Sequence, residues 1–281
     1  MAALTEYDLD IADTTMRCHD GGEGFPLIFV HGSGPGVDTI SNFGRLLPRL
    51  AERYRVVAFD LIGFGRSGRK QAPPYFDMQT WVSQVARVIE HLGVPRVGLV
   101  GHSLGGPIVL EAAAELGPDV VVGTIVTGTM GVPPTAYSSG GPRWKFPDSP
   151  DLILQHVRRT MFDPSTVDPG EVDRRIEVLY ADGYREYFEQ MFADADQCLV
   201  DSVISTSTLD KVTQPVALLH GRFDKSYPAD ESSLVLARYL ARAEVQILDR
   251  CAHSVAHERP DAVEAVVDQL FGDERRSSTT A

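Results

Sequence analysis

Val100-Gly101-His102-Ser103-Leu104-Gly105-Gly106 has the pattern Gly-x-Ser-x-Gly and lies between two segments of different character. The apolar run at 96–100 predicts a buried strand, and the small, apolar residues at 107–114 predict a helix. A serine on a tight turn from strand to helix is typical of a nucleophile elbow, which exposes the hydroxyl at the end of the strand. Glycines at such a turn let neighbouring backbones approach closely. We therefore predict that Ser103 is a nucleophile.

Strands and helices alternate on both sides of this turn. The segment at 4–18 alternates in polarity like an edge strand, and short apolar runs predict buried strands at 26–30, 54–59, 120–127, 214–220 and 244–248. Apolar spacing and helix-ending residues predict helices at 43–52, 78–92, 231–240 and 260–271. This alternation predicts an α/β fold with a doubly wound, mostly parallel sheet.

The segment 128–150 interrupts the alternation, because it is rich in proline and glycine and too loop-like for regular core structure. We expect it to lead into an inserted helical cap with helices at 151–161, 171–180 and 184–194. The predicted organisation is a core of residues 1–130 and 211–272, a cap (lid) of residues 131–210, and a polar, disordered tail at 273–281.

The composition is that of an acidic globular protein. The 281 residues include 39 acidic and 26 basic side chains, a net charge of -13, so no basic stripe is available for nucleic acid. The widely spaced Cys18, Cys198 and Cys251 predict neither a disulfide framework nor a zinc site. The N-terminal segment lacks the features of a signal peptide, and no apolar run reaches membrane-spanning length. We expect a cytoplasmic protein that acts on a small molecule, with neither a nucleic-acid nor a membrane partner.

An acid and a histidine follow the last two predicted core strands. Asp224 comes shortly after the strand at 214–220, and His253 after the strand at 244–248. The chain order Ser, Asp, His is that of α/β-hydrolases. A serine hydroxyl is nearly un-ionised at pH 7, so His253 would remove its proton while Asp224 orients the imidazole. The alternatives are a turn or capping role for Asp224 and a surface position for His253.

A glycine-rich loop, His31-Gly32-Ser33-Gly34-Pro35-Gly36, follows the strand at 26–30. Such a loop can turn N–H groups toward a developing oxyanion, so we predict an oxyanion hole made by the N–H groups of Ser33 and Leu104. A phosphate-binding loop is excluded, because the segment lacks a Gly-Lys-Ser/Thr ending and a Gly-x-Gly-x-x-Gly pattern. Asp60, at another glycine-rich strand end, is interpreted as structural.

With these residues assembled, the chain resembles the α/β-hydrolase superfamily over nearly its whole length, and within it the meta-cleavage product hydrolases. The glycine-rich loop followed by Ser41-Asn42-Phe43 is similar to that family's signature. The resemblance implies a 2-hydroxy-6-oxo-dienoate substrate from aromatic ring degradation, cleaved at a carbon–carbon bond into a 2-hydroxypenta-2,4-dienoate and a carboxylic acid. It also implies a homo-oligomer. No sequence motif indicates a metal, nucleotide or flavin site, so we expect no cofactor.

The resemblance also implies roles for residues around the nucleophile. Ser33, Gly34 and Asn42 would line the polar end of the substrate pocket. Arg175, in the predicted cap helix at 171–180, would contact the substrate carboxylate. Solvated helix charges are the alternative for Arg174 and Arg175, because arginine is usually exposed.

Two positions depart from the family pattern. His102 precedes the nucleophile where the family usually has asparagine, and Ser254 follows the catalytic histidine where it usually has tryptophan. Both border the substrate in the family, so we include them among the predicted substrate-binding residues. Hydrolysis of an ester, lactone or thioester stays open, as does a non-catalytic binding role. Aromatic residues of the cap, expected to line an apolar pocket or to pack the cap on the core, are Tyr137, Trp144, Phe146, Tyr180, Tyr184, Phe188 and Phe192.

Overall fold

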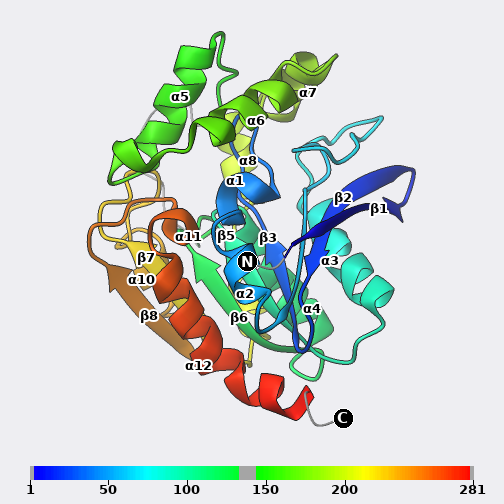
Figure 1. The fold of residues 1–281 in the computed structure, drawn as a ribbon, viewed down its shortest axis with the longest axis vertical. Helices are drawn as coiled ribbons and strands as arrows, with labels where there is room; N and C mark the ends of the chain where they lie inside the picture. The colour runs from blue at the N-terminus through cyan, green and yellow to red at the C-terminus, as the bar shows by residue number, and fades with distance from the viewer. Residues whose placement is uncertain (1–2, 133–143, 279–281) are drawn as a thin grey trace.

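A sheet of eight strands in the order β1-β2-β4-β3-β5-β6-β7-β8 runs through the computed structural model, which describes residues 3–132 and 144–278 (Figure 1). The first two strands pair antiparallel and β2 also pairs antiparallel with β4, whereas the remaining pairs are parallel. The strands are β1 Thr5–Ile11, β2 Thr14–Gly21, β3 Pro26–Val30, β4 Arg55–Phe59, β5 Val97–His102, β6 Val121–Thr127, β7 Val216–Gly221 and β8 Ala243–Leu248. The mostly parallel sheet of the predicted α/β-hydrolase fold is confirmed.

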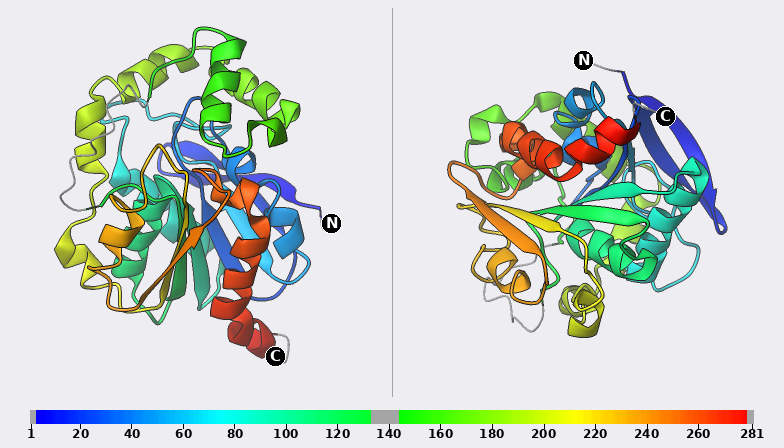
Figure 2. Two further views of the ribbon diagram at one scale, coloured as in Figure 1. Left: turned by 90° about the vertical axis from the view of Figure 1, so that its left-hand side faces the viewer. Right: turned by 90° about the horizontal axis from the view of Figure 1, so that it is seen from below.

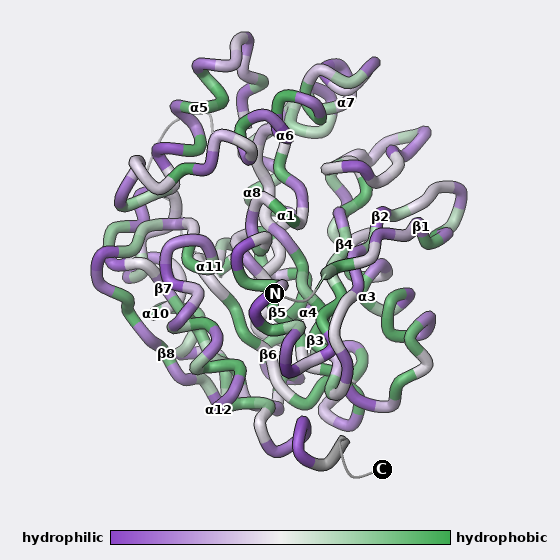
Figure 3. The backbone as a smooth tube through the Cα atoms, viewed as in Figure 1, coloured by the Kyte–Doolittle hydropathy of each residue, from purple (hydrophilic) through white to green (hydrophobic). Residues whose placement is uncertain are grey.

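The sheet has a separate hydrophobic core on each face. Along β3, Ile28 and Val30 belong to one core while Leu27 and Phe29 belong to the other, because successive side chains of a strand point to opposite faces. A strand buried on both sides reads as a continuous apolar run, which is why these strands could be predicted from the sequence. Figure 3 shows this concentration of hydrophobic residues in the central strands.

Helices cover both faces (Figure 2). One core contains residues of α3, α4 and α10, and the other contains residues of α1, α2, α11 and α12. The helices of the core are α1 Thr39–Phe43, α2 Leu47–Leu50, α3 Met78–Leu92, α4 Gly105–Leu116, α10 Ser233–Leu236, α11 Val255–Glu258 and α12 Pro260–Ser278. None of the helices described is long and apolar enough to span a bilayer.

The chain between β6 and β7 forms a further group of helices. Figure 1 shows α5, α6 and α7 above the carboxyl ends of the parallel strands. The helices of this segment are α5 Pro150–Arg159, α6 Pro169–Leu179, α7 Tyr184–Met191, α8 Ala195–Asp201 and α9 Thr206–Leu209, with a 3-10 turn at Pro164–Thr166. The ends of the segment meet where the Ile204 N–H donates to the Gly131 carbonyl oxygen at 2.9 Å, and α9 already packs against α4. The division into core and cap at 131 and 210 stays a prediction.

Several elements differ from the expectation. The single edge strand predicted at 4–18 is a hairpin of β1 and β2. At its turn, Ala12 adopts a left-handed conformation, a position where glycine or asparagine is usual, so this turn had no such signal in the sequence. The helix predicted at 43–52 is replaced by the short α1 and α2, which a turn at residues 44–46 separates. The helix predicted at 231–240 shrinks to α10. The final helix continues to Ser278 rather than ending at Phe271, so residues 273–278 are helical.

Candidate active site

The turn between β5 and α4 holds Ser103 in a strained conformation. Its φ is 53°, and its N–H donates to the Thr127 carbonyl oxygen of β6 at 2.9 Å. Gly105 is required here, because a Cβ at this position would overlap the Val30 carbonyl oxygen of β3. A non-glycine residue in the left-handed region is uncommon and costs free energy, so its presence at a strand end points to a functional site. The strained turn that the Gly-x-Ser-x-Gly motif predicts is present.

Asp224 and His253 lie at the ends of β7 and β8 and are joined by a hydrogen bond. The His253 Nδ1 lies 2.8 Å from the Asp224 Oδ2, and both side chains are buried. The Asp224 Oδ1 accepts from the N–H groups of Ser226 and Tyr227, at 2.7 and 3.1 Å. Burial by itself would raise the pKa of Asp224, but the charges and hydrogen bonds of His253 and a second histidine outweigh it and hold the pKa well below its usual range. An ionised Asp224 therefore accepts a hydrogen bond from the Nδ1–H of His253 and leaves Nε2 of His253 free to accept a proton.

The second histidine is His220, which the sequence analysis did not single out. Its Nε2 lies 3.2 Å from the Asp224 Oδ2 and 2.7 Å from the Tyr227 carbonyl oxygen, and its Nδ1 lies 2.8 Å from the Ser233 Oγ. Its side chain is fully buried in β7. The signal available in the sequence was a polar residue in an apolar strand, four positions before the predicted acid. His220 thus helps to position the carboxylate.

His102 lies against the ring of His253, with the two ring centroids 4.8 Å apart. Its Nδ1 bonds with Thr127 of β6, 3.1 Å from the carbonyl oxygen and 3.0 Å from Oγ1. Burial and the neighbouring His253 hold the pKa of His102 well below its usual value, so it is neutral. His102 therefore supports the ring of His253. The described residues include no hydrogen-bond partner for the Ser103 hydroxyl, a contact that is often long in the absence of substrate.

The glycine-rich loop follows β3 and lies beside Ser103, because β3 and β5 are neighbouring parallel strands. Within the described part of the chain, the N–H groups of Ser33 and Leu104 donate to no acceptor, as donors reserved for an oxyanion would. The loop is held by Asn42, whose Oδ1 accepts from the Gly32 N–H at 2.8 Å. His31 bonds through Nδ1 with the Gly32 carbonyl oxygen, at 2.7 Å. Asn42 therefore positions the loop, and its contact with substrate stays a prediction.

Arg175 of α6 reaches the same loop from above. Its Nη1 donates to the Pro35 carbonyl oxygen at 3.2 Å, and its Nη2 pairs with the Glu171 Oε1 at 3.0 Å. Gly36 has a φ of 65°, and a Cβ there would lie 2.6 Å from the Arg175 carbonyl oxygen. Arg175 is 5% exposed, so the alternative of a solvated helix charge is wrong for this residue. Its buried Nε has no hydrogen-bond partner among the described residues.

Trp144 connects an aromatic cluster to the loop. Its Nε1 donates to the Ser33 Oγ at 2.9 Å, and its ring stacks on Phe192 with centroids 4.8 Å apart. Phe146 and Phe188 also belong to this buried cluster, which is part of the core. Tyr180 is 49% exposed. Tyr137 lies outside the described residues.

Ser254 joins the loop of His253 to the helices above the sheet. Its N–H donates to the Thr160 carbonyl oxygen at 3.1 Å, and its Oγ donates to the Thr160 Oγ1 at 3.0 Å. Both polar groups of Ser254 are thus engaged by the residue that ends α5. A direct role of Ser254 or Gly34 in substrate binding stays a prediction.

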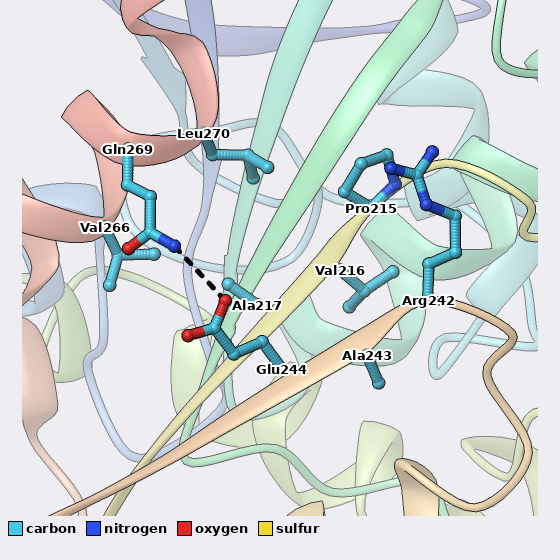
Figure 4. Close-up of a pocket in the computed structure, with 9 residues that line it drawn as sticks. All are labelled: Pro215, Val216, Ala217, Arg242, Ala243, Glu244, Val266, Gln269 and Leu270. Atoms are coloured by element: carbon cyan, nitrogen blue, oxygen red, sulfur yellow. Dashed lines mark hydrogen bonds between the residues drawn. The ribbon is translucent and has the colours of Figure 1, made fainter.

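Two cavities away from Ser103, Asp224 and His253 are lined by none of these predicted catalytic residues. One of about 190 Å³ lies at the amino-terminal ends of β7 and β8, opposite the ends that carry Asp224 and His253 (Figure 4). Gln269 donates to Glu244 beside it, at 3.3 Å. The other, of about 420 Å³, has Arg45, Arg250 and Glu258 among its lining residues. In the described ranges, no group of three or more His, Cys, Asp or Glu side chains is arranged to hold a metal ion.

Comparison with known proteins gives consistent matches. A family model described as the alpha/beta hydrolase family matches residues 27–266. A 2-hydroxymuconate semialdehyde hydrolase from Pseudomonas sp. strain CF600 is 32% identical over 236 residues, 84% of this chain and 82% of that protein. A 2-hydroxy-6-oxo-2,4-heptadienoate hydrolase from Pseudomonas putida is 31% identical over 86% of this chain and 87% of its own. The solved structure of 2-hydroxy-6-oxo-6-phenylhexa-2,4-dienoate hydrolase from Rhodococcus sp. strain RHA1 superposes with a TM-score of 0.86 at 29% identity, covering 96% of this chain and 99% of that one.

Proposed function

Since this chain belongs to the alpha/beta hydrolase family, we propose that it is a meta-cleavage product hydrolase that cleaves a carbon–carbon bond in a 2-hydroxy-6-oxo-dienoate from aromatic degradation. The observation that carries the proposal is the identity of 31 to 32% with two hydrolases of such substrates over most of both chains. The hydrogen bond of 2.8 Å between Asp224 and His253, next to the elbow that holds Ser103, supports it.

In the proposed mechanism, Ser103, His253 and Asp224 form the catalytic triad. The substrate is first converted to its keto form. The Ser103 hydroxyl, which loses its proton to Nε2 of His253, then attacks the C6 carbonyl. The N–H groups of Ser33 and Leu104 stabilise the resulting oxyanion. When the C5–C6 bond breaks, its electron pair is taken up by the conjugated 2-oxo group and the C6 acyl group stays on Ser103 as an ester. Water then hydrolyses this ester, which releases the carboxylic acid and restores Ser103. The products are a 2-hydroxypenta-2,4-dienoate and that acid.

Hydrolysis of an ester or lactone is the second candidate function. The observation that favours it is the pair of residues that depart from the family pattern, His102 and Ser254, since these flank the two proposed catalytic groups. The same triad and the same oxyanion donors can form and hydrolyse an acyl-enzyme.

Stopped-flow absorbance distinguishes the two functions. Purified protein is mixed with a 2-hydroxy-6-oxo-hexa-2,4-dienoate and, separately, with p-nitrophenyl acetate, for the wild type and Ser103→Ala. We expect rapid loss of the dienolate absorbance, much more efficient than ester cleavage, and a loss of kcat of at least about 10³-fold in Ser103→Ala. Ester turnover with an unchanged dienolate would replace the carbon–carbon hydrolase by an esterase.

We also propose that the protein is cytoplasmic and forms a homo-oligomer. Analytical ultracentrifugation at micromolar concentration tests the second statement. A monomer throughout the concentration range would contradict it.

A further inference from the structure

His156 is a polar side chain of α5 that none of the proposed catalytic steps uses. Ile153 and Val157 of the same helix are buried. The Nε2 of His156 lies 3.4 Å from the position that a Cβ on Gly34 would occupy. Gly34 directly follows Ser33, the proposed oxyanion donor. The imidazole therefore lies on the glycine-rich loop, close to the proposed reacting centre.

His156 is the middle one of three contacts between the loop and the segment above it. Trp144 bonds with the side chain of Ser33, His156 lies on Gly34, and Arg175 bonds with the Pro35 carbonyl oxygen. The Nε1 of Trp144 and both terminal nitrogens of Arg175 have hydrogen-bond acceptors, whereas the Nε of Arg175 has none among the described residues. In the described ranges, no residue donates to or accepts from either ring nitrogen of His156. The side chain of His156 is partly buried, so a ligand that supplies the missing partner would form a hydrogen bond shielded from water.

Two arginines and a histidine lie around His156. Arg175 faces it from α6, Arg159 from its own helix, and His253 from the loop after β8. Burial and these three groups lower the pKa of His156 to about 3, so the imidazole is neutral at neutral pH. The Glu171 carboxylate pairs with Arg175 through Oε1, and its Oε2 lies 3.9 Å from Nδ1 of His257. The positive charges of Arg175 and Arg159 would thus stabilise an anion that accepts a hydrogen bond from the N–H of the His156 ring.

We propose that His156 is a specificity-determining residue, which donates a hydrogen bond from its ring to the carboxylate of the substrate and so selects acids over uncharged molecules. This inference rests on the proposed function, because a 2-hydroxy-6-oxo-dienoate carries such a carboxylate. A bound negative charge favours the protonated imidazole, so binding of an acid takes up a proton. Affinity for the acid rises as the pH falls.

Calorimetric titration tests the proposal without relying on catalysis. The probes are 2-oxopentanoate and its uncharged analogue pentan-2-one, titrated at pH 6 and pH 8 in two buffers of different ionisation enthalpy. The variants are His156→Leu and His156→Gln. The matched control is Gln155→Leu, at an exposed position of the same helix. For His156→Leu we expect a Kd for 2-oxopentanoate about tenfold higher, as for one lost hydrogen bond to a charged group, and a Kd for pentan-2-one unchanged within twofold.

His156→Gln retains a donor but cannot take up the proton. It is expected to keep most of the affinity for 2-oxopentanoate at pH 8 and to lose the proton uptake seen in the wild type. Gln155→Leu should behave as the wild type. Equal losses for the acid and the ketone would show a structural role for His156, and no preference of the wild type for the acid would overturn the proposal.

The proposed function has its own test. If the wild type leaves the dienolate unchanged in stopped flow but binds 2-oxopentanoate through His156, the inference stands and the carbon–carbon hydrolase falls. If the dienolate is cleaved but the Kd values of His156→Leu equal those of the wild type, the carbon–carbon hydrolase stands and the role of His156 falls.

Discussion

One carboxylate oxygen of Asp224, Oδ2, lies 2.8 Å from Nδ1 of His253 and 3.2 Å from Nε2 of His220. His253 is the proposed general base, and His220 is fully buried beneath it. The other oxygen of Asp224 accepts two backbone N–H groups. This arrangement holds the carboxylate ionised and in one orientation, and thereby determines which nitrogen of His253 carries the proton.

Asp224→Asn is expected to lower kcat by about 10³- to 10⁴-fold, the size of effect known for the same exchange in a serine protease triad. The amide can present an N–H to His253 and so favour the wrong tautomer, while the fold is retained. Steady-state kinetics with the dienolate or with p-nitrophenyl acetate measures the loss. Far-ultraviolet circular dichroism controls for folding. A kcat within tenfold of the wild type would show that Asp224 is only a turn residue.

Helix α4, which follows the turn of the proposed nucleophile, carries two like charges in its second half. Glu111 is half-buried, and Glu115 lies one turn further along. Burial, followed by the like charge of Glu115, raises the pKa of Glu111 from 4.5 to about 7. The folded state therefore binds more protons than the unfolded state between these two values, and stability falls as the pH rises through that window.

Glu111→Gln is expected to stabilise the protein at pH 8 by about 1 kcal/mol, after allowance for solvent screening of a partly exposed group. The gain should shrink toward zero as the pH falls to 4.5, where Glu111 is already protonated in the folded state. Urea unfolding at pH 5 and pH 8 measures the difference. Glu115→Gln at the exposed neighbouring position should give a smaller gain, and a gain from Glu111→Gln that does not depend on pH would contradict the charge argument.

At the scale of the whole molecule, Glu258 connects the helices above the sheet to the loop of His253. Its Oε1 accepts from the N–H groups of Phe162 and Asp163, at 2.7 and 3.1 Å. Its Oε2 accepts from the Ala252 N–H at 2.8 Å, next to His253. Together with the bonds between Ser254 and Thr160, this carboxylate joins two parts of the chain that are about 90 residues apart.

Glu258→Ala is expected to destabilise the protein by about 3 kcal/mol, because three backbone N–H groups lose a charged acceptor. Thermal unfolding measures the loss. Hydrogen exchange should become faster at both 162–163 and 252, since one carboxylate holds both segments. Asp261→Ala is the control, because Asp261 is an exposed carboxylate that pairs with Arg259 and does not connect these two segments. Faster exchange at only one of the two segments would argue against a shared anchor.

The parts of the fold that follow from local pattern were predictable. Strand β3 coincides with the apolar run at 26–30. Helix α3 begins after its N-cap residue Asp77 and ends before Gly93. The strands that differed lack such marks, as at Ala12, where a left-handed residue turns β1 into β2. Helix α10 covers only Ser233–Leu236 of the helical pattern at 231–240, and it packs against β7.

The sequence alone determined the α/β-hydrolase fold, the strained turn at Ser103 and the order of Ser103, Asp224 and His253, because these depend on residues adjacent in the chain or on strand ends in a known order. Only the tertiary structure decided that Arg175 is buried, that Asn42 holds the loop and that Ser254 binds Thr160. It also placed His220 on Asp224 and His156 on Gly34. The physical reason is that burial and partners depend on which segments meet at the carboxyl ends of the strands. For His156 and Gly34, separated by more than a hundred residues, no local pattern encodes that meeting.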